Sequence, residues 1–418
     1  MRKLIACGVA LVGALALTVP GAIGSAEQTP GVTARSITIG GTFPLTGPAA
    51  AYAPIPVGMR AYFSYINARR GPDGKRGVGG RQIVWKFYDD GYNPANTVQL
   101  TRRLVEQDKV FATVGQLGTE HNQAVREYLN QRKVPQTLVS TGASFFGSQG
   151  KQFPWTIGWQ PDYIAEGRLY GLHIKNNHRG KKIAILYQND DYGKDYLYGV
   201  KYALGEAYVN QNLAIAEAFE VTATSLASQM TRIRASGAPI LVILATPTPT
   251  IRAYATGKAL GYNPEQIYVN SVSATAAFLN VAVNAAGANY VDGSISVAYL
   301  KDPSSPTWNN DAAMKLYREI MQKYAPNVNA NDGLYFYGVA KAETFVQALY
   351  KAGKNPTRQG LMNALLSINQ TNKFLLPNVK QKTSRTDRFV ISQMQLQRYK
   401  HPDWVRFGPI VEGRPGSK

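Results

Sequence analysis

The chain has 418 residues, with 46 Lys and Arg against 26 Asp and Glu, and a formal net charge of +20 at pH 7. This length can bury two cores, and the mixture of hydrophobic and charged residues excludes a disordered or fibrous protein. The basic residues are scattered rather than gathered in a run, so we expect a solvated surface and no nucleic-acid partner.

The first 26 residues have the pattern of a cleaved secretory signal peptide. A short basic end, residues 1–3, precedes an apolar stretch, residues 4–19, and small residues around Gly24 offer cleavage sites. A retained transmembrane helix is the alternative, but the apolar run is short and is interrupted by Gly and Pro. We therefore expect an exported, periplasmic protein, which loses its single cysteine, Cys7, with the signal peptide and so has no disulfide.

From residue 36 the sequence alternates between short apolar runs and segments with apolar residues at helical spacing. In chain order this predicts strands at 37–41, 82–88, 110–114 and 134–139, helices near 58–68, after 93 and near 123–130, and then a loop-like segment at 145–167. Asn93 before Pro94 is typical of a helix start. The Asn side chain caps free N–H groups, and Pro at the first helical position loses no hydrogen bond.

The alternation resumes at residue 181. It predicts strands at 181–187, 213–221, 240–244, 266–269 and 295–299, helices around 197–208, 230–233, 251–260, 312–324 and 335–352, and antiparallel strands at 389–396 and 404–407. Alternation of this kind is typical of parallel sheets with helices on both faces.

Two separate runs of this alternation predict an α/β protein with two doubly wound, parallel-sheet lobes. We expect residues 27–156 with 298–389 to form lobe 1, and residues 157–297 with 390–418 to form lobe 2. The lobes would be joined by three crossovers, near Thr156, Val297 and Phe389, and would close on a solute by a hinge.

Two loops of small polar residues follow neighbouring predicted strands of the first lobe. Residues 115–119 read Gly-Gln-Leu-Gly-Thr, and residues 140–144 read Ser-Thr-Gly-Ala-Ser. Small ligands bind at the carboxyl ends of parallel strands, so this edge is a candidate site for a small polar solute. The sequence has no phosphate-binding loop, no nucleophile elbow and no histidines paired at metal-ligand spacing. We therefore expect no enzyme, no metal and no cofactor. The enzymatic alternative is His121, acting as a base beside Thr119.

These loops occur together with Asp89-Asp90 before Asn93-Pro94 and with Asp191-Tyr192-Gly193 after the first strand of the second lobe. In this order they resemble the leucine/isoleucine/valine-binding proteins, the type I periplasmic solute receptors of ABC importers. The resemblance covers nearly all of the chain after the signal peptide. It implies two lobes that close on a small-molecule solute like a Venus flytrap, and permease subunits in the inner membrane as partners. We expect a monomer.

The resemblance also implies roles for individual residues of the first lobe. A ligand carboxylate would be held by the hydroxyls of Thr119 and Ser144 and by the backbone N–H groups of Gly142 and Ala143. Such donors can bind a carboxylate without a full positive charge. The alternative for Thr119 and Ser144 is that they cap the helices that follow them.

Aromatic residues would complete the pocket. Tyr192 corresponds to a tyrosine that closes over the ligand from the second lobe, and Tyr52 to a residue of the side-chain pocket, with a surface position as the alternative for either. Trp159 and Trp155 lie near the first crossover and could add an aromatic wall. Core or hinge packing is their alternative role.

Two positions depart from the amino-acid binders of this family. Val272 stands where they carry a carboxylate for the ligand's ammonium, and Thr246 stands where an aromatic residue is expected. A buried, unpaired ammonium is costly, so we expect a small carboxylate or amide without that group, aromatic compounds included. Glu120 is the acid that could pair with an ammonium. The functional alternatives are a true branched-chain amino acid binder, a ligand-sensing receptor for a signalling partner, and a secreted hydrolase that uses His121 or Glu120.

Overall fold

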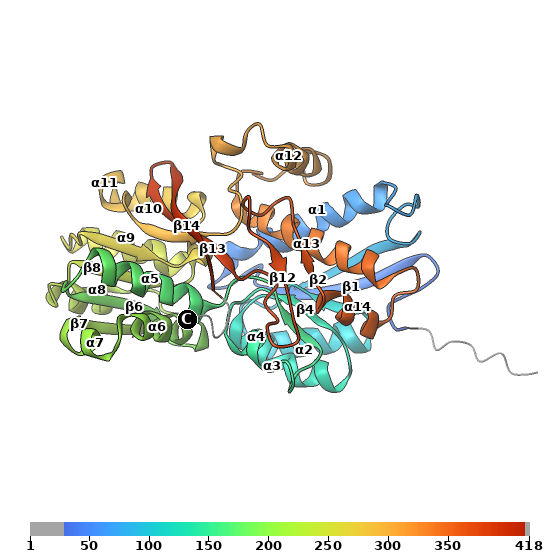
Figure 1. Ribbon diagram of the computed structural model, residues 1–418, viewed down its shortest axis with the longest axis horizontal. Coiled ribbons are helices and arrows are strands. Elements are labelled where there is room, and N and C mark those ends of the chain that lie inside the picture. Colours follow the sequence, from blue (N-terminus) through green and yellow to red (C-terminus); the bar gives the residue numbers. More distant parts are fainter. Residues whose placement is uncertain (1–28, 414–418) are drawn as a thin grey trace, which may run out of the picture.

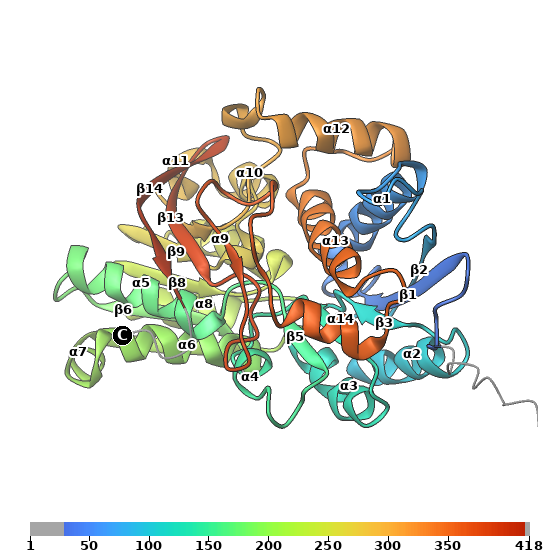
Figure 2. The same cartoon turned by 45° about the vertical axis from the view of Figure 1, so that its right-hand side comes forward.

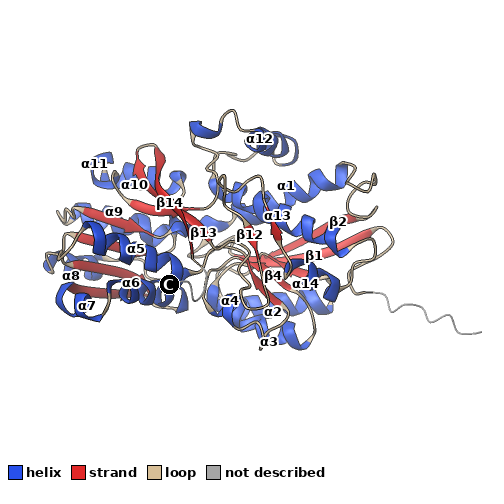
Figure 3. Ribbon diagram, viewed as in Figure 1, coloured by secondary structure: helices blue, strands red, loops and turns tan. Residues whose placement is uncertain are grey.

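Two main sheets, each with helices on both faces, organise the computed structural model, which describes residues 29–413 (Figures 1 and 3). The predicted signal peptide, residues 1–26, lies outside the described residues. The predicted α/β class with parallel sheets is confirmed. The chain leaves the first sheet after residue 158, returns to its helices after residue 298, and joins the second sheet again at residue 393. These points lie near the three expected crossovers. We propose that each sheet with its helices is one lobe, with the boundaries given above.

The first sheet has the strand order β2-β1-β3-β4-β5, and every neighbouring pair is parallel. Its strands are β1 (Ser36–Phe43), β2 (Gln82–Asp89), β3 (Ala112–Val114), β4 (Gln136–Val139) and β5 (Thr156–Gly158). Its helices are α1 (Pro54–Ala68), α2 (Pro94–Glu106), α3 (Thr119–Gln131), α4 (Phe145–Ser148), α12 (Ala312–Tyr324), α13 (Gly333–Ala352) and α14 (Arg358–Leu365). The strand order reverses between β1 and β3, and such switch points are where open α/β sheets bind ligands.

The second sheet has the order β14-β13-β10-β9-β8-β6-β7, in which only β13 and β14 run antiparallel to their neighbours. Its strands are β6 (Ile183–Gln188), β7 (Leu213–Phe219), β8 (Ile240–Leu244), β9 (Gln266–Val269), β10 (Ile295–Ala298), β13 (Gln393–Lys400) and β14 (Asp403–Glu412). Its helices are α5 (Tyr163–Asn177), α6 (Asp191–Leu204), α7 (Glu206–Asn212), α8 (Ala227–Ala235), α9 (Pro247–Ala259), α10 (Ala276–Ala286) and α11 (Ala288–Val291).

The shorter elements are η1 (Ala50–Tyr52), η2 (Ser271–Ser273), η3 (Pro306–Trp308) and the pair β11 (Asn369–Gln370) and β12 (Gln381–Lys382). No helix between residues 29 and 413 has the length and apolar character needed to cross a membrane.

Strand β6 shows how one sheet serves two cores. Ile183 and Ile185 pack with α5 and α6 on one face, whereas Ala184 and Leu186 pack with α8 and α9 on the other. Successive side chains of a strand point to opposite faces, so a strand covered on both sides is apolar throughout. This explains the continuous apolar runs in the sequence.

Helix α13 is the buried centre of the first lobe, and it packs tightly on α1 (Figure 2). A Cβ atom on Gly58 would lie 2.2 Å from the Tyr335 carbonyl oxygen, and one on Gly338 would lie 2.2 Å from the Ile55 carbonyl oxygen. The two helices therefore approach closely enough that neither glycine tolerates a side chain without a shift of the backbone.

The prediction of a loop at 145–167 was wrong. That segment holds α4, β5 and the start of α5, and α5 itself was not predicted. Gly167 and Gly171 weaken the helical pattern of α5. They are present because a Cβ there would lie 2.4 Å from the Tyr196 carbonyl oxygen and 2.5 Å from that of Val200, both on α6. Tertiary packing has overridden local propensity. The helix predicted near 197–208 is divided at Gly205, which has a positive φ of 84°.

Candidate functional site

A cavity of about 950 Å³, measured with its open mouth, lies between the two sheets. Nine parallel strands each contribute a wall residue that follows their carboxyl ends. These residues are Tyr52 after β1, Tyr92 after β2, Thr119 after β3, Ser140 after β4, Gln160 after β5, Tyr192 after β6, Thr246 after β8, Val272 after β9 and Tyr299 after β10. The cavity therefore lies where the topology of both sheets places a ligand.

Six tyrosines give the cavity its character. They are Tyr52, Tyr92, Tyr163, Tyr192, Tyr299 and Tyr337. Burial raises the pKa of every one of these hydroxyls, so each is a neutral group that can donate or accept a hydrogen bond. The rings of Tyr163 and Tyr192 meet edge to face at 5.1 Å. A wall of this kind suits an apolar or aromatic solute that carries a few polar atoms.

Thr119 lies on the cavity wall, and its Oγ1 is 2.7 Å from Oγ1 of Thr141. Helix α3 begins at Thr119, and its N-cap is Gly118, which has a φ of 107° and makes no side-chain cap. The alternative that Thr119 caps this helix is therefore not what the structure shows. The positive φ of Gly118 turns the chain sharply, so that the first residue of α3 faces the cavity.

Three neighbouring residues of the second predicted loop do not line the cavity, contrary to expectation. The N–H of Ser144 donates to Oδ2 of Asp195 at 2.7 Å, and the N–H of Ala143 donates to Oγ1 of Thr141 at 3.1 Å. Gly142 is packed against the carbonyl of Pro161, which a Cβ would approach to 2.1 Å. The donors of Ser144 and Ala143 are thus used within the protein, and it is Ser140, at the start of the loop, that faces the cavity.

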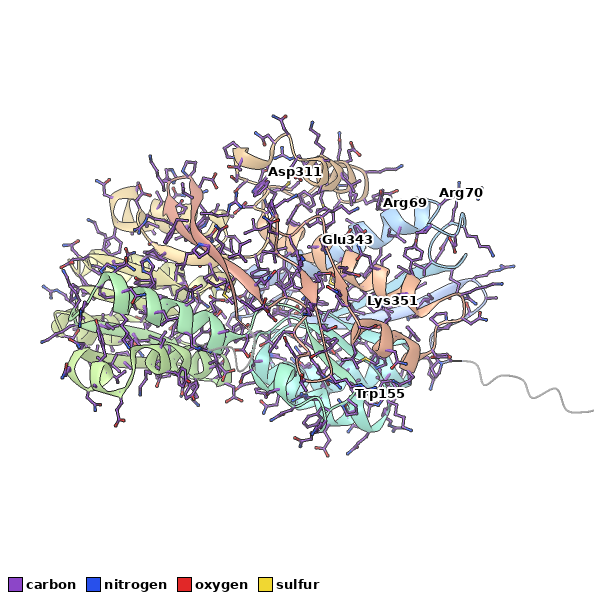
Figure 4. All side chains as sticks on the ribbon, in the orientation of Figure 1. Arg69, Arg70, Trp155, Asp311, Glu343 and Lys351 are labelled. Atoms are coloured by element: carbon purple, nitrogen blue, oxygen red, sulfur yellow. The ribbon has the colours of Figure 1, made fainter. Side chains whose placement is uncertain are left out.

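Trp159 also lies behind the wall rather than in it. Its ring is fully buried and meets the rings of Tyr337 and Tyr299 edge to face, at 4.7 and 6.3 Å. Its Nε1 donates to Oγ1 of Thr344 at 3.3 Å. Trp155 lies further away, at the lower edge of the first lobe (Figure 4). Both tryptophans therefore have the packing role that was their alternative.

Tyr52 makes a hydrogen bond between the two predicted lobes, whereas Tyr192 bonds within its own predicted lobe. Tyr52, from the first, donates its hydroxyl to the carbonyl of Val272 at 3.4 Å, a long hydrogen bond. Tyr192, from the second, accepts a hydrogen bond from Nδ2 of Asn270. Thr246 also lies on the wall, but its hydroxyl donates to Oε1 of Gln188 at 3.1 Å. Five of the nine predicted site residues therefore line the cavity. They are Tyr52, Thr119, Tyr192, Thr246 and Val272.

The sequence reasoning missed an acid in the cavity wall, Asp302. Its Oδ1 accepts from the N–H and hydroxyl of Ser304, its Oδ2 accepts from the N–H of Ala276 at 3.3 Å, and burial raises its pKa. Lys301 beside it also reaches the wall and pairs with Asp311 at 2.7 Å. Both residues follow β10, so the rule about carboxyl strand ends could have found them had it been applied to that strand.

A second cavity, of about 760 Å³, adjoins the first, and Tyr92 lines both. Glu120 and His121 open into this second cavity and not into the main one. The His121 ring packs against that of Tyr92, with the ring centres 4.2 Å apart and the planes tilted by 33°. Neither ring nitrogen of His121 has a hydrogen-bond partner, and burial lowers its pKa to about 4. Glu120 is therefore not placed to pair with an ammonium in the main cavity. Within residues 29–413 no three His, Cys, Asp or Glu side chains form a group that could hold a metal ion.

Comparison with known proteins agrees with this geometry. A family model described as periplasmic binding protein matches residues 36–403. A protein of Pseudomonas aeruginosa named amino acid binding protein is 24% identical over 229 residues, which span 55% of this chain and 58% of that relative.

Two solved structures share the fold over almost the whole chain. The fatty acid ABC transporter substrate-binding protein of Thermomonospora curvata has a TM-score of 0.75 and 21% identity, covering 94% of this chain and 95% of its own. A branched-chain amino acid ABC transporter protein of Thermus thermophilus with bound valine has a TM-score of 0.77 and 15% identity, covering 91% and 97%.

Proposed function

The chain belongs to the periplasmic binding protein family, and we propose that it is the solute receptor of an ABC importer that captures a small carboxylate or amide, aromatic compounds included. Export through the signal peptide would place it in the periplasm, where permease subunits of the inner membrane would receive the solute. The similarity of its fold to two ABC transporter proteins supports this role.

One observation carries the choice of ligand: six neutral tyrosines and Val272 line the cavity. By the resemblance, Val272 stands where amino-acid binders of the family carry an acid. Neutral hydroxyls satisfy a carboxylate or amide, whereas an ammonium at that position would have no counter-charge. One solved structure with this fold is of a protein named for fatty acid transport. A fatty acid has a carboxylate and no ammonium, which supports the same class of ligand.

The test is isothermal calorimetry with a panel of organic acids, their amides and amino acids. We expect binding by members of the first two classes, with affinity lost in Tyr192→Ala. Tyr198→Ala is the matched control, because Tyr198 lies on the same helix with 56% of its surface exposed. Tight binding of leucine, with no response to any acid or amide, would contradict the proposed ligand class.

A second candidate, a true branched-chain amino acid binder, is favoured by Asp302, the half-buried acid of the wall. In that case leucine would bind, and Asp302→Asn would abolish its binding because the ammonium would lose its only acidic partner among the described residues that line the cavity. The first candidate instead predicts that Asp302→Asn leaves the binding of organic acids in place or strengthens it, because a negative charge is removed.

A further inference from the structure

Lys341 is a buried lysine without an acidic partner. It lies in the middle of α13 with no exposed surface, and among residues 29–413 no Asp or Glu lies within ion-pairing distance of its ammonium. Lys301, the other lysine buried near the cavity, pairs with Asp311. Burial lowers the pKa of Lys341 because an ammonium loses hydration there that no counter-charge replaces. A lysine buried without a counter-charge is unfavourable for folding, so its presence in the core needs an explanation.

The surroundings of this ammonium are neutral but polarisable. Its Nζ donates to Oγ of Ser140 and, at 3.0 Å, to the hydroxyl of Tyr337, and it lies 5.0 Å from the ring centre of Trp159. Aromatic faces and hydroxyls stabilise a cation only in part. A Cβ on Gly115 would lie 2.9 Å from Cδ of Lys341, so this glycine leaves the room that the lysine occupies. The titratable group in contact with the ammonium is Tyr337, from the same helix.

A chain of hydrogen bonds connects Lys341 to the cavity wall, and each group in it donates to the next one. Tyr337 accepts from Lys341 and donates to Oε1 of Gln160 at 2.6 Å, and Nε2 of Gln160 donates to the hydroxyl of Tyr163 at 3.1 Å. Ser140 accepts from Lys341 and donates to the carbonyl of Gly115 at 2.7 Å. Tyr337, Gln160, Tyr163 and Ser140 all line the cavity. A chain of donors that begins at a cation is polarised so that its far end is positive.

We propose that Lys341, in its protonated form, is the counter-charge for an anionic solute, so that the cavity binds carboxylates in preference to the corresponding amides. This inference rests on the proposed function and narrows its ligand class. The carboxylate would interact with Lys341 across the Tyr337–Gln160–Tyr163 hydrogen-bond chain, in a region that water screens poorly. An anion in the cavity also favours the protonated form of the lysine.

The experiment compares acids with their own amides, because each pair differs in charge and little in shape. The probes are benzoate and benzamide, phenylacetate and phenylacetamide, and isocaproate and isocaproamide, measured by thermal shift and then by calorimetry. For pairs that bind, we expect the acid to bind the wild-type protein about tenfold or more tightly than the amide. In Lys341→Met, which keeps an unbranched, flexible side chain but ends one atom short of the ammonium position, most of this preference should be lost.

Lys351→Met is the matched control. Lys351 lies on the same helix (Figure 4), but it is exposed and donates to the carbonyl of Ser367. The substitution removes the same net charge, so the preference for acids should remain. If Lys341→Met does not fold, Tyr337→Phe takes its place, since it interrupts the hydrogen-bond chain and should reduce the preference in the same direction.

Three results would overturn the inference. Amides that bind the wild-type protein as tightly as the acids would show that the cavity does not select charge. An unchanged preference in Lys341→Met, or in Tyr337→Phe, would show that Lys341 is not its source. If amino acids bind but no acid or amide does, the proposed ligand class itself fails, and the inference fails with it. This last result is distinguishable, because it appears in the wild-type screen before any variant is made.

Discussion

Replacement of Glu343 by glutamine should stabilise the protein above neutral pH. Glu343 lies on α13 (Figure 4) with 2% of its surface exposed. Its Oε1 is 3.4 Å from Nζ of Lys373, and its Oε2 has no hydrogen-bond partner. Burial raises the pKa of this carboxyl to about 7, from an ordinary value of 4.5, although Lys373 opposes the change. The charged form is therefore unfavourable in the folded protein.

The sign and size follow from the two pKa values. Between pH 4.5 and about 7 the folded protein keeps a proton that the unfolded chain releases, so the free energy of unfolding falls as the pH rises. A raised pKa of this size corresponds to about 3 kcal/mol of lost stability above neutral pH. Glutamine resembles the protonated acid, so Glu343→Gln should recover most of this stability at about pH 8 and little of it at about pH 4.5.

The assay is urea unfolding of the wild type and the variant, followed by tryptophan fluorescence at both pH values. Glu319→Gln is the control, because Glu319 is exposed on α12 and its substitution should leave stability nearly unchanged. The reasoning is wrong if Glu343→Gln gains no stability at the higher pH, or if it gains equally at both.

Two further substitutions test packing and closure. Gly58→Ala would bring a Cβ within 2.2 Å of the Tyr335 carbonyl oxygen, so we expect a loss of roughly 1–3 kcal/mol and a lower melting temperature in a thermal unfolding experiment; an unchanged melting temperature would mean that α1 and α13 separate easily. Asp195→Ala removes the acceptor for the Ser144 N–H, a contact between the predicted lobes, and should weaken solute affinity roughly 3- to 10-fold in calorimetry. Equal affinities would show that this contact plays no part in closure.

Most of the fold was predicted from the apolar runs that mark buried strands. Buried strands such as β8 (Ile240–Leu244) are short, continuous apolar runs that local sequence displays directly. Helix α5 was not predicted because its glycines weaken the helical pattern. They allow close contact with α6, and a contact with a distant segment cannot be seen in the local sequence. Helix α10 also went unpredicted, although Thr275 caps it by accepting from the N–H of Phe278.

The candidate site was predictable to the extent that it depends on strand ends. Tyr52, Thr119 and Tyr192 follow strands and lie on the cavity wall. The sequence could not show whether the backbone N–H groups of the second loop, residues 140–144, are free to bind a ligand. Whether an N–H is free for a ligand depends on partners such as Asp195, which lies 51 residues from Ser144 along the chain.

By itself, the sequence determined the class of protein, because βα alternation and the order of the loops are properties of neighbouring residues. The sequence also showed that position 272 is a valine, and a valine has no charge whatever its surroundings. Only the tertiary structure decided which charges reach the cavity. Asp302 follows a strand, but its sequence position alone does not show that it is half-buried in the wall, and nothing in the local sequence shows that Lys341 lies behind the wall. The charge around a ligand is set by groups that meet in space from distant segments, and by the water that burial removes from them.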